Sequence, residues 1–296
     1  MSRADDSGTD AATTAGAVVA VLRRYGEELP PRERAAAADE PDGVHQARIL
    51  VRRLRSVLGA ARDVFEEGAA ERVRDRFERL GDDLGEVRDL EVRILHAEEH
   101  VAPGADATVV ERLILRERDR YREAHAELVA VLDGAADVHA ALAALVGDPP
   151  VAASKAGVDA EVGLTAILRH EIRRVRRAER HAFGDLDSLH RLRRTARRLR
   201  YTVEAFTEEP ADLLGDDVRA LGAAAKDVQD VLGDHRDALL FALQVRRAEA
   251  DARAAGEPAD DYARIADDAF AAATERIEAL PEALRAFHGR ADAVAG

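Results

Sequence analysis

Two stretches of the sequence carry a histidine followed by arginines at helical spacing. The repeated residues, offset by 145 positions from the first copy to the second, are His45, Arg48, Arg52, Arg55 and His190, Arg193, Arg197, Arg200. At about 100° per residue, the four residues of each copy fall on one narrow stripe of a helix. Arginine suits phosphoryl oxygens because its planar fork donates two parallel hydrogen bonds and stays charged near neutrality. Histidine adds another donor, so the stripes predict anion binding.

The opposite face of each striped helix is apolar, with Leu50, Leu54 and Leu58 in the first and Leu192 and Leu199 in the second. We therefore expect that face to be buried and the stripe to be accessible. Like charges at this spacing repel by about a few tenths of a kcal/mol per pair, yet no acid is interleaved. A single basic helix face is usually solvated or paired with neighbouring acids. Its duplication favours an external anion, and two stripes along one groove suit a linear polyanion.

A second motif is also repeated, in the same order after each stripe. Leu84-Gly85-x2-Arg88-Asp89 recurs as Leu232-Gly233-x2-Arg236-Asp237. Arg88 and Arg236 either add a basic group to the cavity, with the aspartate orienting a neighbouring arginine, or form structural ion pairs between helices. Lys226 either reaches the ligand as a point charge or is a solvated surface lysine.

Other patterns have two interpretations or a weak signal. Arg53 and Arg198 lie at the margin of their stripes. Four arginines at 4-3-4 spacing either extend the groove or lie on the outer surface, namely Arg169, Arg173, Arg176 and Arg180. The segment His96-Ala-Glu98-Glu99-His100 matches the H-x-x-E-H pattern of inverted zincins, but it lies where a helix is expected to end, and no third ligand can be nominated. We therefore expect no metal site and no cofactor.

The elements that position these residues are predicted to be helices throughout. Alanine is abundant, only 9 residues are Pro, and strand alternation is absent. The expected helices fall near 10–28, 43–65, 70–98, 106–132, 135–146, 157–183, 187–208, 212–248 and 259–287. The expected breaks are Pro30-Pro31, Pro41-Asp42-Gly43, Pro103-Gly104, Gly184, Pro210 and Gly256-Glu257-Pro258.

The repeated motifs predict an internal duplication, giving two four-helix bundles related by pseudo-twofold symmetry. We expect a disordered N-terminus over residues 1–9 and a single domain over 10–290. Its two helical repeats would cover 10–146 and 157–290, joined by a linker at 147–156.

Composition narrows the function classes. With Cys 0, disulfides and thiolate chemistry are excluded. A net charge of −14 argues against a nucleic-acid or membrane-surface partner, although arginines outnumber acids between positions 169 and 200. No apolar run approaches the roughly 18 residues that span a bilayer. The first ten residues lack a secretory signal layout, so we expect a soluble, cytoplasmic protein.

The motifs resemble those of the CHAD family, the conserved histidine α-helical domain. Two segments resemble its signature helices, namely Val44-His45-Gln46-x-Arg48-x3-Arg52-Arg53-Leu54-Arg55 and Leu189-His190-x-Leu192-Arg193-x3-Arg197-Arg198-Leu199-Arg200-Tyr201-x2-Glu204. The motifs beginning at Leu84 and at Gln229 resemble the segments that follow them. The resemblance covers nearly the whole chain. One departure is that the family's basic positions commonly mix Lys with Arg, whereas here they are almost all Arg.

The resemblance implies two four-helix bundles and non-enzymatic binding of inorganic polyphosphate in a central cavity lined by arginine and histidine. By motif match, the implied contacts are His45, Arg48, Arg52, Arg55, His190, Arg193, Arg197 and Arg200, with Arg53, Arg198 and Tyr201 as further candidates. Together with Arg88, Arg236 and Lys226, these are the expected polyphosphate-binding residues. The resemblance also makes attachment to polyphosphate granules an expectation.

Two other functions share this phosphate chemistry. A metal-dependent polyphosphatase or triphosphatase would need carboxylates beside the phosphate, and Glu204 is the only acid on a stripe face. A nucleic-acid-binding helical protein would need aromatic side chains for stacking, which the basic helices almost lack. The sequence leaves open the oligomeric state, the preferred chain length and the physiological consequence of binding.

Overall fold

The computed structural model describes residues 12–182 and 185–295, and these residues are mainly helical. No β-strand occurs in these two ranges, and two isolated bridges pair Thr13 with Asp159 and Phe65 with Val151. The all-α prediction is confirmed. The disorder expected for residues 1–9 and the break expected at Gly184 lie outside the described residues.

Two groups of helices follow one another along the chain. The first comprises α1 (Thr14–Ala37), α2 (Gly43–Ala60), α3 (Ala69–His100), α4 (Ala107–Val110), α5 (Arg116–Asp133) and α6 (Ala136–Gly147). A 3-10 turn, η2 (Arg62–Val64), follows α2, and a π-helical turn, η3 (Glu111–Leu115), joins α4 to α5. The second group comprises α7 (Ala160–Glu179), α8 (Leu186–Thr207), α9 (Asp216–Ala254), α10 (Asp260–Ile277) and α11 (Leu280–Ala295).

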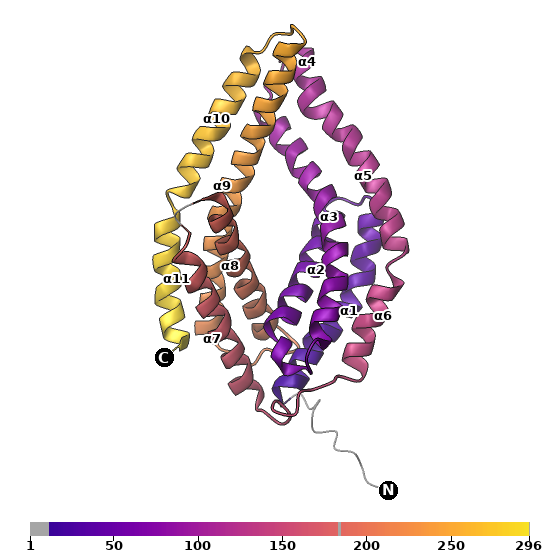
Figure 1. Cartoon of the computed structure of the whole chain (residues 1–296), viewed down its shortest axis with the longest axis vertical. Helices are drawn as coiled ribbons and strands as arrows, with labels where there is room; N and C mark the ends of the chain where they lie inside the picture. Colours follow the sequence, from indigo (N-terminus) through magenta and orange to yellow (C-terminus); the bar gives the residue numbers. More distant parts are fainter. Residues whose placement is uncertain (1–11, 183–184, 296) are drawn as a thin grey trace.

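The two groups meet at separate places. Figure 1 shows them side by side, joined at the lower end where the chain passes from α6 to α7 and at the upper end where α4 lies beside the end of α9. Between the groups, α2 packs directly against α8. The two helices that carry the arginine stripes are therefore neighbours. The predicted internal duplication and the boundaries at 10–146 and 157–290 stay predictions.

Two hydrophobic cores correspond to this arrangement. The larger core runs continuously through both groups, and it includes Leu54 of α2 and Leu199 of α8, both at 0% exposure. The apolar faces predicted for the two striped helices are buried as expected. A smaller core, which includes Leu113 of η3, Phe241 of α9 and Tyr262 of α10, lies at the upper junction. Burial thus fixes how α2 and α8 are rotated about their axes, and with it the direction of their stripes.

The break predicted at Pro30-Pro31 is wrong, because α1 continues through both prolines to Ala37. A proline inside a helix costs about 3 kcal/mol through a lost hydrogen bond and a clash. On either side of the prolines, Leu29 and Ala36 are both at 0% exposure, and burying a leucine side chain contributes about 1.5–3 kcal/mol. Tertiary packing therefore carries the helix past the prolines.

The single helix predicted near 259–287 is also wrong, because the structure divides it into α10 and α11 at Glu278 and Ala279. Pro281 is the second residue of α11. A proline is tolerated in the first turn of a helix, where its missing N–H has no intrahelical partner. Pro281 was therefore a usable signal for a new helix start.

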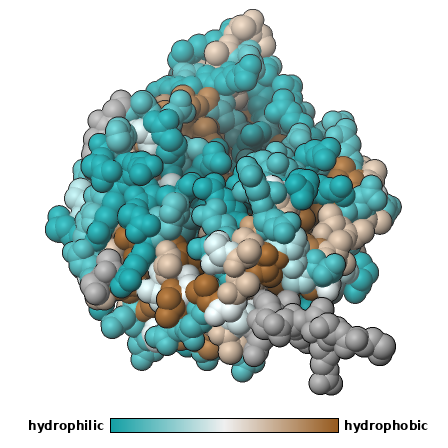
Figure 2. Space-filling view, turned by 60° about the horizontal axis from the view of Figure 1, so that its bottom comes forward, coloured by the Kyte–Doolittle hydropathy of each residue, from teal (hydrophilic) through white to brown (hydrophobic). Residues whose placement is uncertain are grey.

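Within the described ranges, no single helix is long and apolar enough to cross a membrane, and one bent pair, Ala107–Asp133 with Ala136–Gly147, passes that test by length and composition only. The face drawn in Figure 2 is largely hydrophilic, with hydrophobic residues showing in its lower part.

Candidate anion-binding site

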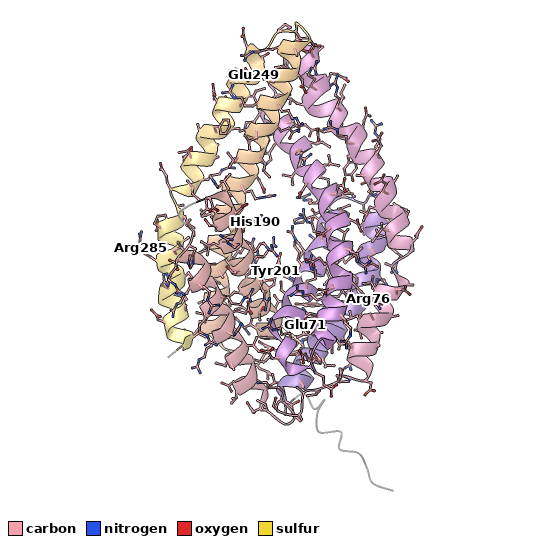
Figure 3. All side chains as sticks on the ribbon, in the orientation of Figure 1. Glu71, Arg76, His190, Tyr201, Glu249 and Arg285 are labelled. Carbon is pink, nitrogen blue, oxygen red and sulfur yellow. The ribbon has the colours of Figure 1, made fainter. Side chains whose placement is uncertain are left out.

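A cavity of about 1160 Å³ lies between the two groups of helices, and residues from α2, α3, α7, α8 and α9 line it. The predicted stripe residues that line it are Arg48, Arg52, Arg55, His190, Arg193 and Arg197. Both stripes therefore face one hollow. Figure 3 places His190 on α8 toward the middle of the molecule. Arginines outnumber carboxylates in the lining, so the cavity is cationic although the whole chain carries −14.

Three of these arginines lack an acidic partner. No carboxylate in the described part of the chain forms an ion pair with Arg52, Arg193 or Arg197, and the Nε of Arg193 is buried without a hydrogen-bond partner. Burial and the charge of Arg197 lower the pKa of Arg52 to about 9. Burial and the charge of Arg193 lower the pKa of Arg197 to about 10. Each still carries its charge at neutral pH. The carboxylates of Asp237 and Asp89 act on Arg193 without forming an ion pair, so the cluster is a cationic centre that the protein offsets only in part.

The protein's own carboxylates neutralise the flanking arginines. Arg48 Nη1 donates to Asp89 at 2.9 Å, and Arg55 Nη2 donates to Glu78 at 2.5 Å. Both carboxylates lie on α3, where Asp82 and Glu86 also line the cavity. One wall of the cavity is therefore acidic and faces the arginines of α2 and α8.

The glycines of the second repeated motif make room for the arginines. A Cβ at Gly85 would lie 3.5 Å from Arg48 Nη2, and one at Gly233 would lie 3.2 Å from Arg193 Nη2. A Cβ at Gly81 would lie 2.9 Å from Arg55 Nη1, so this glycine also leaves room for an arginine of α2. The sequence analysis assigned roles only to the arginine and aspartate of this motif. At Gly233 the absence of a side chain leaves room for the Arg193 guanidinium against α9, whereas a Cβ at Gly85 would be in ordinary van der Waals contact with Arg48.

Arg200, Arg53 and Tyr201 do not line the cavity. Arg53 and Arg200 both bond Glu204, at 2.9 and 2.6 Å, and their guanidinium carbons lie 6.0 and 5.3 Å from the centre of the Tyr201 ring. Tyr201, labelled in Figure 3, is 4% exposed. Because Arg53 belongs to α2 and the others to α8, this cluster ties the two striped helices together. A helical wheel of one helix carries no information about such a neighbour.

Arg198 is both a cavity residue and a contact between helices. It lines the cavity, and its Nη2 donates to Glu171 of α7 at 2.8 Å and to the carbonyl oxygen of Gly59 in α2. Glu171 is at 0% exposure, so this is a buried ion pair that braces three helices. Removing one partner of such a pair would leave the other charge buried and uncompensated.

The two histidines differ in position. His190 lines the cavity, and His45 does not. Burial, followed by the charge of Arg236, lowers the pKa of His190, while burial followed by Arg88 lowers that of His45. In the protein alone, both imidazoles therefore favour the neutral form.

The two copies of the second motif differ: the arginine of one copy lines the cavity, and the arginine of the other forms an ion pair outside it. Arg236 lines the cavity and lies 3.4 Å from Asp237, while Arg88 is outside the lining and bonds Glu91 at 2.8 Å. Asp89 forms an ion pair with Arg48, which links α3 to α2. Lys226 also lies outside the lining and pairs with Asp230 one helical turn away.

The cavity does reach α7, but not through the arginines that the sequence analysis considered. Arg169, Arg173 and Arg180 are exposed, and Arg176 pairs with Asp292 of α11 at 2.5 Å. The residues of this region that do line the cavity are Arg174, Arg177 and Ala178 of α7 and His181, which follows the helix. Since Leu168, Ile172 and Val175 are the buried positions, the face beside them could have been inferred from the core pattern. The other lining arginines that the sequence analysis missed are Arg74, Arg191 and Arg194.

Comparison with known proteins identifies the family. The model described as "CHAD domain" matches residues 20–246. Among curated proteins, the chain is 31% identical over 274 residues to the uncharacterized protein Rv2226 of Mycobacterium tuberculosis strain H37Rv, covering 88% of this chain and 50% of the relative. A second relative, the uncharacterized protein MT2285 of strain CDC 1551, is 30% identical over the same length. The chain thus spans about half the length of the curated relatives it matches.

Two solved structures share the fold. The crystal structure of the CHAD domain from the plant Ricinus communis has a TM-score of 0.69 at 23% identity, and the match covers 97% of this chain and 95% of that one. PptA from Streptomyces chartreusis has a TM-score of 0.66 at 19% identity, covering 94% of this chain and 99% of that one. The match spans both groups of helices and the cavity between them.

Proposed function

Because the chain belongs to the CHAD domain family, we propose that it binds inorganic polyphosphate in the cavity between α2 and α8, without making or breaking a bond. The observation that carries the proposal is the centre formed by Arg52, Arg193 and Arg197. These guanidiniums are partly buried, repel one another and have no carboxylate partner among the described residues. An anion with several charges would relieve that repulsion.

The extended distribution of positive charge in the cavity favours a phosphate chain over a compact anion. Guanidiniums from α2, α7 and α8 line the cavity, so the cationic surface is extended. Each phosphate of a linear chain can accept the paired hydrogen bonds of an arginine fork. Longer chains engage more arginines at once, which raises affinity through effective concentration.

Calorimetric titration with polyphosphates of several chain lengths tests the proposal. Affinity should rise with chain length and fall steeply between roughly 50 and 200 mM salt, by analogy with counterion release from other polyanions. Arg197→Glu should weaken binding by more than about tenfold, a loss of at least about 1.4 kcal/mol. The matched control is Arg169→Glu, which makes the same charge change on the exposed face of α7. Absence of binding by long chains at moderate salt would refute the proposal.

The acidic wall supports a second candidate, a metal-dependent polyphosphatase. Asp82 and Glu86 of α3 line the same cavity as the arginines, whereas Glu204 is occupied by Arg53 and Arg200. Carboxylates beside a phosphate site are what metal-assisted hydrolysis needs. Incubation with polyphosphate and Mg²⁺ or Mn²⁺ tests it. Release of phosphate that is lost in the Asp82→Asn variant would show catalysis instead of binding alone. In a separate competition experiment, displacement of polyphosphate by RNA would favour a nucleic-acid ligand.

A cellular role follows from the binding proposal. A protein that holds polyphosphate in this cavity would be recruited to polyphosphate granules. Imaging a tagged copy in cells that accumulate polyphosphate tests this, with the Arg197→Glu variant as the matched comparison. Granule localisation of the variant equal to that of the wild type would separate recruitment from the cavity.

A further inference from the structure

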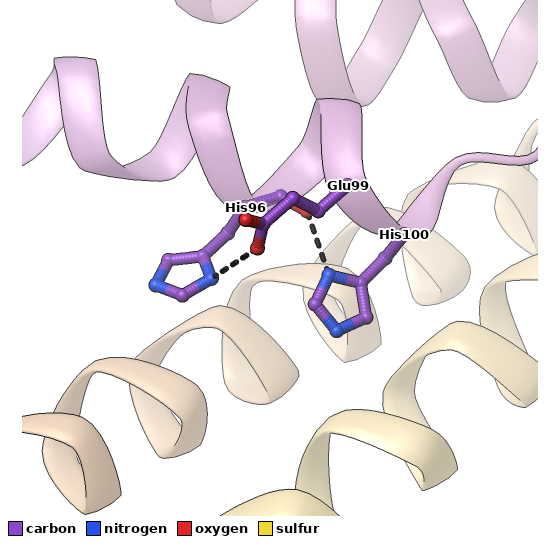
Figure 4. Close-up of side chains that lie close together, drawn as sticks. All are labelled: His96, Glu99 and His100. Atoms are coloured by element: carbon purple, nitrogen blue, oxygen red, sulfur yellow. Dashed lines mark hydrogen bonds and ion pairs between the residues drawn. The ribbon is translucent and has the colours of Figure 1, made fainter.

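A histidine-rich cluster lies far from the arginine cavity, at the end of α3. His96, Glu99 and His100 are on successive turns of this helix, and they face α9 of the second group (Figure 4). The smaller hydrophobic core lies directly beneath them, through Ala97 on the same helix and Phe241 on α9. The cluster therefore belongs to the upper junction of the molecule, and neither the polyphosphate proposal nor its alternatives use it.

The two imidazole rings are held in place by packing. The ring centres of His96 and His100 lie 5.6 and 5.1 Å from that of Phe241, and 6.2 Å from one another. His100 Nδ1 lies 2.8 Å from the carbonyl oxygen of His96. A carbonyl can only accept, so Nδ1 of His100 carries the proton and its Nε2 keeps a free lone pair. A histidine whose second nitrogen donates to a carbonyl is a common arrangement for metal ligands.

The third group of the cluster supplies negative charge. Glu99 Oε2 lies 3.7 Å from Nδ1 of His96, and the Glu99 side chain is 71% exposed. One ligand atom from each of the three residues can be chosen so that all lie within 4.8 Å of one another. In a tetrahedral zinc site with bonds of about 2.0–2.1 Å, ligand atoms are about 3.4 Å apart. Binding an ion here requires the exposed Glu99 side chain to rotate toward the rings, and the two rings to turn slightly against Phe241.

We propose that His96, Glu99 and His100 form a binding site for a divalent transition metal of the zinc class, with solvent completing the coordination. Two imidazoles one helical turn apart lie on the same helix face and can bind one ion together. Imidazole nitrogen selects zinc-class metals over Mg²⁺ and Ca²⁺, which prefer oxygen ligands. The ion links the last turn of α3 to itself, directly before the chain leaves for α4. It thereby stabilises the part of α3 that packs on Phe241.

The experiment uses tag-free protein that has been treated with a chelator and titrated with ZnCl₂ by calorimetry. We expect one saturable ion per chain, and a melting temperature that rises with zinc concentration as a native-state ligand requires. Titration with Co²⁺ should produce visible absorption bands of low-symmetry nitrogen and oxygen coordination. Zinc affinity should fall as the solution is acidified, because protons compete for the imidazoles.

The double variant His96→Gln/His100→Gln should lose zinc binding by more than about tenfold, while its polyphosphate affinity stays unchanged. Glu99→Gln, at an exposed position, should weaken zinc binding without affecting folding and covers the case in which the double variant is unstable. The matched control is His288→Gln, because this histidine lies 2.9 Å from Glu179 but belongs to no group of three possible metal ligands among the described residues. Full zinc binding by both the double variant and Glu99→Gln, or absence of saturable binding by the wild type, would overturn the proposal.

Discussion

At the scale of single residues, the cavity holds two kinds of arginine. Arg52, Arg193 and Arg197 have no acidic partner in the described part of the chain, whereas Arg48 and Arg55 are bonded to Asp89 and Glu78. The first kind is destabilising in the protein alone and available to a ligand. The second kind is already neutralised, so a ligand must compete with the protein's own carboxylates.

We predict that Arg197→Gln raises the melting temperature of the ligand-free protein and weakens polyphosphate binding. Burial and Arg193 lower the pKa of Arg197, which means that the folded state disfavours this charge. Removing the charge removes repulsion, so stability and affinity should change in opposite directions. Differential scanning calorimetry and polyphosphate titration measure the two effects. A lower melting temperature would contradict the prediction.

Replacing a competing carboxylate should have the reverse effect on affinity. In Asp89→Asn, Arg48 loses its ion pair at 2.9 Å and becomes available to phosphate, so polyphosphate should bind several-fold more tightly. Titration of the variant beside the wild type measures the change. Asp292→Asn is the control, because it frees Arg176 on the side of α7 away from the cavity. Weaker binding by Asp89→Asn would mean that Asp89 positions Arg48 for the ligand.

The affinity for polyphosphate should increase as the pH falls from about 8 to about 6. Burial and Arg236 lower the pKa of His190 in the free protein, and a bound phosphate would favour the protonated ring. The same shift predicts that ligand-free stability decreases as the pH falls below about 6.5, since the unfolded chain takes up the proton more readily. Titrations at both pH values measure the effect. His190→Gln should abolish the part of the gain that this ring supplies.

Residue types and spacing predicted some of the arginines that line the cavity, but not which residues of each stripe are kept out of it. The wheel correctly grouped Arg48, Arg52 and Arg55, because the buried apolar face fixes the rotation of α2. It placed Glu204 on the stripe face one turn after Arg200, but it could not show that Glu204 also receives Arg53 from the other helix. Contacts between helices decide which arginines of a stripe are available.

At the scale of elements, the striped helices depend on α3 and α9 for space. The glycine of each second motif lies beside a stripe arginine, so the backbone of α3 or α9 approaches the guanidinium closely. The helix bounds were predicted where apolar periodicity and breakers agreed. They were wrong at Pro30-Pro31 and at Pro281, where burial and position within a turn decide the outcome.

Gly233→Ala tests this dependence. The new Cβ would lie 3.2 Å from Arg193 Nη2, which must shift, so polyphosphate affinity should fall by a few-fold. Stability should fall little or rise, because alanine favours a helix over glycine by about 1 kcal/mol. Gly289→Ala in α11 is the matched control, since a Cβ there meets nothing within 4 Å. Equal affinity of the Gly233→Ala variant and the wild type would remove the proposed role of the motif glycine.

At the scale of the whole molecule, the two groups of helices are joined at both ends of the cavity. At the upper junction, Arg112 of η3 bonds Glu257, in the turn between α9 and α10, at 2.8 Å. Tyr262 of α10 donates to the carbonyl oxygen of Thr108 in α4 at 3.0 Å. Phe241 packs beneath this contact at 2% exposure. Neither motif search nor helical periodicity predicted this second junction, because its partners are far apart in the sequence.

Phe241→Ala should weaken the upper junction specifically. Truncating a buried phenylalanine costs about 3–5 kcal/mol, so the melting temperature should fall. Hydrogen exchange should increase in η3, the start of α10 and the end of α3, while amides of α2 and α8 keep their protection. Uniformly faster exchange across both groups of helices would show that the junction is not a separate unit.

The two junctions favour a preformed cavity over one that closes on its ligand. Because the walls are joined at both ends, we expect the separations between guanidiniums to be set before any ligand binds. Selectivity would then come from matching the phosphate repeat to those fixed separations, and little of the binding energy would be spent on reshaping the protein.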